Sequence, residues 1–267
     1  MLIWSRRGRY AAWSGALLLT AALFMAPLAV ILVASLAGQW NGMLPSAPTL
    51  EHYRRSLSGD ALLAIRASLV TGLLTSGLAL ASGTWAALAL RDAGERATRA
   101  FGWIFFLPSA VPSVSVGLGL LVAFSRPPLV LNGTIVIVMM AHFVLVSSFA
   151  YGNVAAGLSR LPADFEQVAA VLGATPAYRL RHVTLPLIAP YLLAAFGLSF
   201  ALSMGELGAT VMVYPPRWVT LPVTIFGLGD RGETFTGAAL TIMLVVATLA
   251  LLLALERLAK GSVGSAP

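Results

Sequence analysis

Six long apolar segments divide the chain, and they constrain its fold more than any other feature. Each is long enough to cross the roughly 30 Å hydrocarbon core of a bilayer, which takes about 20 residues of helix. Strands of a membrane barrel would be about ten residues long with alternating polarity. The sequence therefore predicts an all-α membrane protein with six transmembrane helices. The segments run over residues 13–37, 61–90, 101–124, 130–152, 187–213 and 235–255.

The composition agrees with a membrane location. Hydrophobic residues make up 58% of the chain and charged residues only 10%, with a mean hydropathy of +0.88. Soluble domains carry about 25% charged residues and could not hide this much apolar surface. Gly, Ala, Ser and Thr are frequent within the segments, which suits close approach of helix backbones.

Nucleic-acid and metal partners are not indicated. The net charge is +7, but the basic residues lie at the ends of apolar segments, as in a membrane protein. The chain has no cysteine, so disulfides and thiolate metal ligands are excluded. Its three histidines, His52, His142 and His182, are too scattered for a metal-ligand motif.

The basic residues also predict an orientation. With the N-terminus in the cytoplasm, 11 of the 17 Lys and Arg residues fall on the inner side, and the even span count puts the C-terminus there too. The first segment follows Arg6, Arg7 and Arg9 like a signal peptide. It is too long and lacks a cleavage site, so we expect a retained span. The predicted parts are a cytoplasmic segment 1–12, a six-span domain 13–260 and a flexible tail 261–267.

The cytoplasmic connection 153–186 contains two predicted short helices. Asp164 and Gln167 form a capping-box pattern that predicts a helix start, and an apolar stripe at helical spacing follows. Gly173 suits a left-handed helix end, and Thr175-Pro176 predicts the cap and first turn of a second helix over 177–183, ended by Leu185-Pro186. Such a pair could lie on lipid, pack on its own bundle or dock a partner. The stripe comprises Phe165, Val168, Ala169 and Leu172.

The same loop resembles the EAA loop of bacterial ABC importer permeases. That motif has Glu-Ala-Ala, a Gly after three intervening residues, an aliphatic residue ten positions after the Gly, and then Leu-Pro. Ala169, Gly173, Val183, Leu185 and Pro186 match it. Gln167 stands at the position of the motif's Glu and Val168 at that of its first Ala. Glu166, one position earlier, is a candidate to supply the missing carboxylate.

The resemblance implies a type I ABC importer permease (MetI-like) fold with cytoplasmic coupling helices in the bacterial inner membrane. The chain would be a transport subunit rather than an enzyme, and it has no G-x-x-x-x-G-K-[ST] loop of its own. A dimer of partner ATPase subunits would use the ATP, and this chain would bind no cofactor. The further partners implied are a second permease, identical or similar, and a periplasmic substrate-binding protein. The residues implied in ATPase coupling are Asp164, Phe165, Glu166, Gln167, Val168, Ala169, Leu172, Gly173, Arg179, Arg181, Val183, Leu185 and Pro186.

Nearly the whole chain is similar to the 2-aminoethylphosphonate importer permeases. The likeness includes Met1-Leu-Ile-Trp-Ser5, Gln39-Trp-Asn-Gly42, Trp85-Ala-Ala-Leu-Ala-Leu-Arg91 and Ala141-His-Phe-Val-Leu145. It implies that substrate. Charge and spacing do not themselves indicate a phosphonate.

Polar residues within the spans are candidates for a solute pathway. The third segment contains Pro108, Pro112, Ser113 and Ser115, which indicate either a packing kink or a broken helix that lines a cavity. Glu206 lies within the fifth segment with Ser203 nearby, and an ionisable residue there indicates a pathway or a helix contact. We expect His142 to be a hydrogen-bonded packing residue.

Three alternatives remain open from the sequence. The importer could carry another solute, since Gly205-Glu-Leu-Gly-Ala209 also resembles molybdate, sulfate and thiamine permeases; a polyamine is a further candidate. The chain could instead be a proton-coupled secondary transporter with Glu206 as the proton site, or a membrane scaffold without transport. The outer loops 38–60 and 214–234 are candidates for docking the binding protein.

Overall fold

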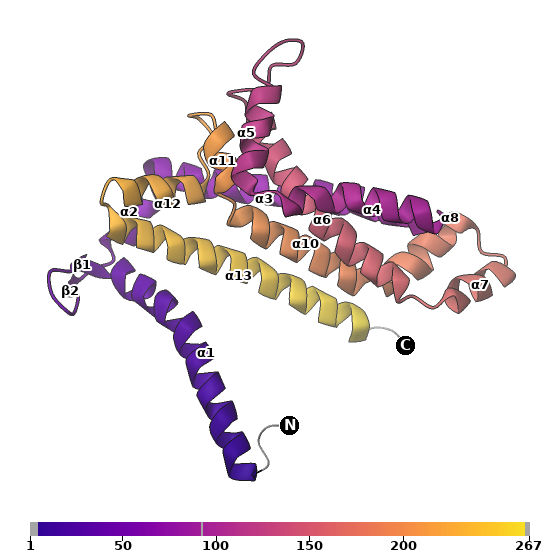
Figure 1. Ribbon diagram of the computed structural model, residues 1–267, viewed down its shortest axis with the longest axis horizontal. Coiled ribbons are helices and arrows are strands. Elements are labelled where there is room, and N and C mark those ends of the chain that lie inside the picture. Colours follow the sequence, from indigo (N-terminus) through magenta and orange to yellow (C-terminus); the bar gives the residue numbers. More distant parts are fainter. Residues whose placement is uncertain (1–4, 92, 265–267) are drawn as a thin grey trace. The chain divides into compact units, whose positions relative to one another are not determined.

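Helices make up nearly all of the structure, a computed structural model that describes residues 5–91 and 93–264 (Figure 1). Two compact units are present. One consists of residues 1–61 and 225–243, and the other of residues 62–224 and 244–267.

The first unit contains the N-terminal helix α1 (Arg6–Ser35), which Ser5 caps by accepting a hydrogen bond from the Gly8 amide at 3.0 Å. Only Ser35 of α1 is buried, so its apolar residues are free to face lipid. α1 begins seven residues before the predicted first span, so residues 6–12 are helical. A short antiparallel sheet, β1 (Ala37–Gln39) and β2 (Ser46–Pro48), and helix α2 (Glu51–Ser56) follow. Neither the sheet nor α2 was predicted from the sequence.

Polar contacts hold these pieces of the first unit together. Tyr53 of α2 shares a 2.6 Å hydrogen bond with Ser35 at the end of α1. His52 reaches the Ala37 carbonyl at 3.0 Å and the Thr236 hydroxyl at 3.3 Å, where Thr236 belongs to α13 (Thr234–Gly264).

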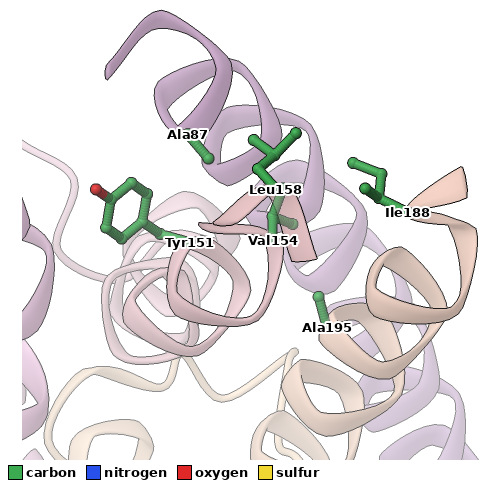
Figure 2. Packing of buried hydrophobic residues seen from close by; sticks show 6 residues of the cluster. All are labelled: Ala87, Tyr151, Val154, Leu158, Ile188 and Ala195. Carbon is green, nitrogen blue, oxygen red and sulfur yellow. The ribbon is translucent and has the colours of Figure 1, made fainter. Parts of the chain in front are cut away.

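The second unit is built around three helices, α3 (Gly59–Arg91), α6 (Ile135–Ser159) and α10 (Ala189–Met204). Figure 2 shows one core cluster where they meet. Glycine allows α3 and α6 to approach closely, because a Cβ on Gly83 of α3 would lie 2.8 Å from the Tyr151 amide nitrogen of α6. The cluster comprises Ala87, Tyr151, Val154, Leu158, Ile188 and Ala195.

Within the described residues, four helices, α1, α3, α6 and α13, are long and apolar enough to span a bilayer. Two bent helix pairs bring the count there to six if each pair is one span. The predicted all-α fold with up to six spans is therefore confirmed. α13 continues to Gly264, beyond the predicted start of the C-terminal tail at residue 261; residues 265–267 lie outside the described part of the chain.

The third predicted span is two helices rather than one. α4 (Glu95–Ala110) and α5 (Ser113–Ala123) meet at an angle of 101°, and Figure 1 shows α5 standing away from α4. Pro112 explains the break, because proline disfavours helical backbone at the residue before it, and Val111 is extended with ψ 136°.

The fifth predicted span is also interrupted. α10 ends at Met204, and the separate helix α11 (Gly208–Val213) begins four residues later. The chain then turns through Trp218, whose indole donates a 2.9 Å hydrogen bond to the Thr71 hydroxyl of α3. α12 (Leu221–Asp230) leads from this turn to α13.

Candidate functional site

The predicted cytoplasmic helix pair is present and lies at one end of the second unit (Figure 1). Its first helix, α7 (Ala163–Val171), starts after Pro162. Asp164 does not cap it, so the predicted capping box is wrong. The extended backbone of Pro162 (φ −62°, ψ 133°) lets the helix begin at Ala163, two residues earlier than a cap at Asp164 would give, which leaves Asp164 in the first turn.

The turn between the two helices follows the prediction. Gly173 has φ +88°, a left-handed conformation that favours glycine. Thr175 caps the next helix, α8 (Pro176–Arg179), because its hydroxyl accepts a 3.3 Å hydrogen bond from the Tyr178 amide. Together, Gly173 and Thr175 fix the direction of α7 relative to α8.

The second helix does not end at Leu185-Pro186 as predicted. It continues through a π-helical turn, η1 (Leu180–Thr184), into α9 (Leu185–Leu187), and bends by 66° before α10. Pro186 has no backbone N–H to donate. It stands in the first turn of α9, after the π-turn, where a missing backbone donor is tolerated.

An apolar face of α7 is uncovered. Phe165 is 52% exposed, Val168 58% and Leu172 81%, and the neighbouring Val171 is 88% exposed. We call these four residues the docking face. Ala169 is half-buried, and Gln167, at the position of the motif's Glu, is exposed. Asp164, Arg181 and Pro186 are exposed, while Arg179, Val183 and Leu185 are half-buried.

Glu166 points away from the docking face and into the bundle. Its Oε1 accepts hydrogen bonds from Arg91 Nη1 at 2.7 Å and from the buried Thr184 hydroxyl at 2.5 Å. Arg91 is the last residue of α3, and it was not predicted from the sequence as a site residue. Because 75 residues separate the pair, no local sequence signal links them.

The Glu166 carboxyl is stabilised in its ionised form. The hydrogen bond from Arg91 is the main cause that lowers its pKa; the Thr184 hydroxyl and the nearby charges of Arg91 and Arg179 act in the same direction, while partial burial opposes them. The carboxylate is therefore ionised throughout the neutral range.

A pH prediction follows from this lowered pKa. Since the folded pKa lies below the unfolded value of about 4.3, the stabilisation is complete above that value and is lost as the pH falls through the folded pKa. We expect the wild-type thermal midpoint to exceed that of Glu166→Gln by a constant amount from pH 8 to about pH 5. The difference should shrink below about pH 4, measured by thermal unfolding of the two purified proteins. A difference that grew on acidification would contradict the assignment.

A cleft of about 180 Å³ opens where α4, α5, α6 and α10 meet. Four of the pathway candidates line it: Pro108, Ser113, Ser203 and Glu206. Pro112 and Ser115 do not, and both are exposed. Apolar side chains such as Phe149 and Leu202 form much of the remaining wall.

His142 of α6 bridges the break between α10 and α11. Its ring nitrogens lie 2.7 Å from the Ser203 hydroxyl and 2.8 Å from the Thr210 hydroxyl, on opposite sides of the break. All three residues are buried, which confirms the prediction of a hydrogen-bonded packing histidine. Thr75 of α3 extends the network to Ser203 at 3.3 Å.

Glu206 has a structural contact beside the cleft. Its Oε1 accepts a 2.7 Å hydrogen bond from the Ala209 amide and so supports the first turn of α11. A single carboxylate thus both lines the cleft and stabilises the helix break. Within residues 5–91 and 93–264, no group of three or more His, Cys, Asp or Glu is arranged to hold a metal ion.

The profile of a known family, described as the binding-protein-dependent transport system inner membrane component, matches residues 79–262. The chain belongs to this family. It is a permease subunit of an ABC importer, as the EAA-like loop indicated. The matched residues include α7, α8 and the residues that line the cleft.

Two curated relatives align with 97% and 68% of the permease. The Salmonella typhimurium protein that bears the name 2-aminoethylphosphonate transport system permease protein PhnV is 58% identical over 260 residues, covering 97% of this chain and 98% of that protein. The resemblance found in the sequence is therefore confirmed. The molybdenum transport system permease protein ModB of Mycobacterium bovis is 33% identical and covers 68% of this chain and 74% of its own.

Solved structures confirm the permease fold. A chain of a bacterial ABC transporter involved in the import of the acidic polysaccharide alginate superimposes with a TM-score of 0.75, covers 94% of both chains and is 16% identical. A chain of the MetNI methionine ABC transporter gives a TM-score of 0.61, covers 75% of this permease and 93% of that chain, and is 15% identical. The MetI-like fold predicted from the sequence is thus confirmed.

Proposed function

We propose that this permease forms the membrane pathway of an ATP-driven importer for 2-aminoethylphosphonate. The identity of 58% over 97% of the chain to a protein named for that solute carries the proposal. The identity to a molybdenum permease is 33% over 68% of the chain, which favours a molybdenum solute less.

The docking face is the proposed contact with the ATPase. Its four exposed apolar side chains form the centre of a small interface, and exposed polar residues such as Asp164 and Gln167 form the rim. The capped turn at Gly173 and Thr175 holds the face in a fixed direction. A fixed face transmits a push from a closing ATPase, whereas a flexible loop would absorb it. The chain itself performs no catalysis in this proposal.

The proposed assembly contains this permease, a second permease, two ATPase subunits and a periplasmic binding protein. The family description, a binding-protein-dependent transport component of the inner membrane, supports the binding protein. The excess of Lys and Arg on one side supports cytoplasmic termini, and with them a coupling loop (residues 153–186) on the side where ATP is available.

The substrate is tested by uptake in cells that lack their own importer and express this permease with the neighbouring ATPase and binding protein. We expect accumulation of 2-aminoethylphosphonate, with no accumulation of molybdate, sulfate, thiamine or putrescine. Uptake of one of those solutes with none of the phosphonate would overturn the proposed substrate while leaving the importer class intact.

The cleft is the proposed section of the pathway within this chain, and Glu206 gives it its charge. Replacing Glu206 with Gln keeps an acceptor for the Ala209 amide but removes the charge, whereas Ala removes both. We expect Glu206→Gln to lower uptake about tenfold at normal protein levels, because the charge in the cleft is lost. Glu206→Ala should lower uptake as well, and it should also lower the free energy of unfolding by about 1 kcal/mol because the cap on α11 is lost. Full uptake by Glu206→Gln would remove the pathway role.

A further inference from the structure

We propose that Arg91, Glu166 and Thr184 form a clamp that fastens the coupling helix to the membrane bundle and makes ATP use and solute movement proceed together. The inference rests on the proposed function, since it concerns how the docking face of α7 drives the spans. It assigns Glu166 to an internal contact rather than to the surface that meets the ATPase.

The clamp joins three separate elements. Glu166 belongs to the first turn of α7, Arg91 ends α3, and Thr184 ends the π-turn that leads into α10. One carboxylate oxygen accepts both hydrogen bonds, at 2.7 Å from Arg91 and 2.5 Å from Thr184. A displacement of α7 therefore pulls on two spans through the same atom.

The environment of the clamp makes this contact stronger than a surface ion pair. The Arg91 and Glu166 side chains are only 26% and 20% exposed, and Thr184 is buried. Exposed ion pairs contribute little because water screens them. A charged hydrogen bond that is largely withdrawn from water is stronger and more directional.

The clamp is fixed to the core cluster of Figure 2. Ala87 lies one helical turn before Arg91, and Ile188 lies one turn after Thr184. Leu90, Leu161 and Leu185 pack against the same cluster. Because packed interiors deform little, a force applied at Glu166 moves the ends of α3 and α10 rather than bending the contact.

The docking face and the clamp have different roles in α7: the first binds the partner, and the second transmits its motion. The four side chains of the docking face are between 52% and 88% exposed, so this face is open to a partner. The Glu166 side chain is only 20% exposed. Gln167, which stands at the position of the motif's Glu, is exposed and so is open to a partner. Binding of the ATPase and transfer of its motion should therefore be separable by mutation.

The clamp is tested first in the purified permease alone, which makes the result independent of the proposed function. The chain has no cysteine, so Ala170→Cys on the exposed side of α7 gives a single site for a nitroxide label. We expect Glu166→Gln, Arg91→Gln and, more weakly, Thr184→Val to increase the mobility seen in the label's EPR spectrum. The matched control is Arg55→Gln, which breaks an exposed ion pair of 3.1 Å in α2 and should leave the spectrum unchanged. Unchanged spectra in all three clamp variants would overturn the clamp.

The second test uses the assembled importer in liposomes. In Glu166→Gln and Arg91→Gln the ATPase should still co-purify, while solute transported per ATP hydrolysed should fall by roughly threefold to tenfold, the range for losing one partly exposed charged hydrogen bond. The exchange Arg91→Glu with Glu166→Arg should recover at least half of the loss. Loss of the ATPase in Glu166→Gln with a normal Arg91→Gln would instead place Glu166 in the ATPase interface and overturn the clamp. A wild-type permease that never retains an ATPase would refute the proposed function, with the EPR result unaffected.

Discussion

Placing aspartate at both Val168 and Leu172 should abolish ATP-driven uptake and remove the ATPase from the purified complex. Both side chains are exposed on the docking face, so the substitutions leave the folded permease intact while they put two charges at the apolar centre of the proposed interface. Truncating or charging a residue at an interface centre costs 2 kcal/mol or more, and two such sites together should weaken binding by roughly a thousandfold or more. Co-purification from detergent and uptake in whole cells measure the two effects.

A matched control separates a local effect from a general one. Leu44 is also 81% exposed but lies in the loop between β1 and β2, away from the coupling loop in sequence. Leu44→Asp should leave ATPase co-purification at the wild-type level. If the double variant on α7 retained the ATPase as well as Leu44→Asp does, the docking face would not be the ATPase contact.

Replacing Gly117 by valine should remove most of the folded protein from the membrane. Gly117 lies in α5 against α11, where a Cβ would approach the Ala209 carbonyl oxygen at 2.6 Å and its Cα at 2.7 Å. The Ala209 backbone cannot move aside as a flexible side chain can. A valine at position 117 therefore forces α5 and α11 apart beside the cleft. Overpacking of this kind costs on the order of 1–3 kcal/mol or more. Membrane accumulation and the thermal midpoint of the purified protein measure the loss.

Gly119, two residues later on the same helix, is the control for that prediction. A Cβ there meets nothing within 4 Å. Gly119→Val should therefore accumulate and unfold like the wild type. Equal behaviour of the two variants would mean that α5 and α11 are not in the close contact described.

The sequence was most informative where one local rule acts alone. Long apolar runs define α1, α3, α6 and α13, because a bilayer demands a minimum length. The left-handed conformation of Gly173 and the cap at Thr175 were also predictable, since each depends on residues within one turn.

Features that depend on distant residues could not be predicted. The Pro-rich third segment indicates a break, but the 101° angle between α4 and α5 is set by packing against α6 and α11. The break after Met204 has no proline, and it is stabilised by Glu206 and by His142 from another helix. Asp164 carried the local capping signal, yet Pro162 starts α7, and Glu166 turns inward because Arg91 and Thr184 lie there.

The source of energy for transport distinguishes an ATP-driven importer from a proton-coupled transporter. The permease, its ATPase and its binding protein are reconstituted in liposomes with 2-aminoethylphosphonate outside, and uptake is measured with ATP enclosed or with a proton gradient in its place. We predict uptake that requires enclosed ATP, survives collapse of the proton gradient and stops when the ATPase is omitted. Uptake that continues without the ATPase and ceases when the proton gradient is collapsed would contradict this account.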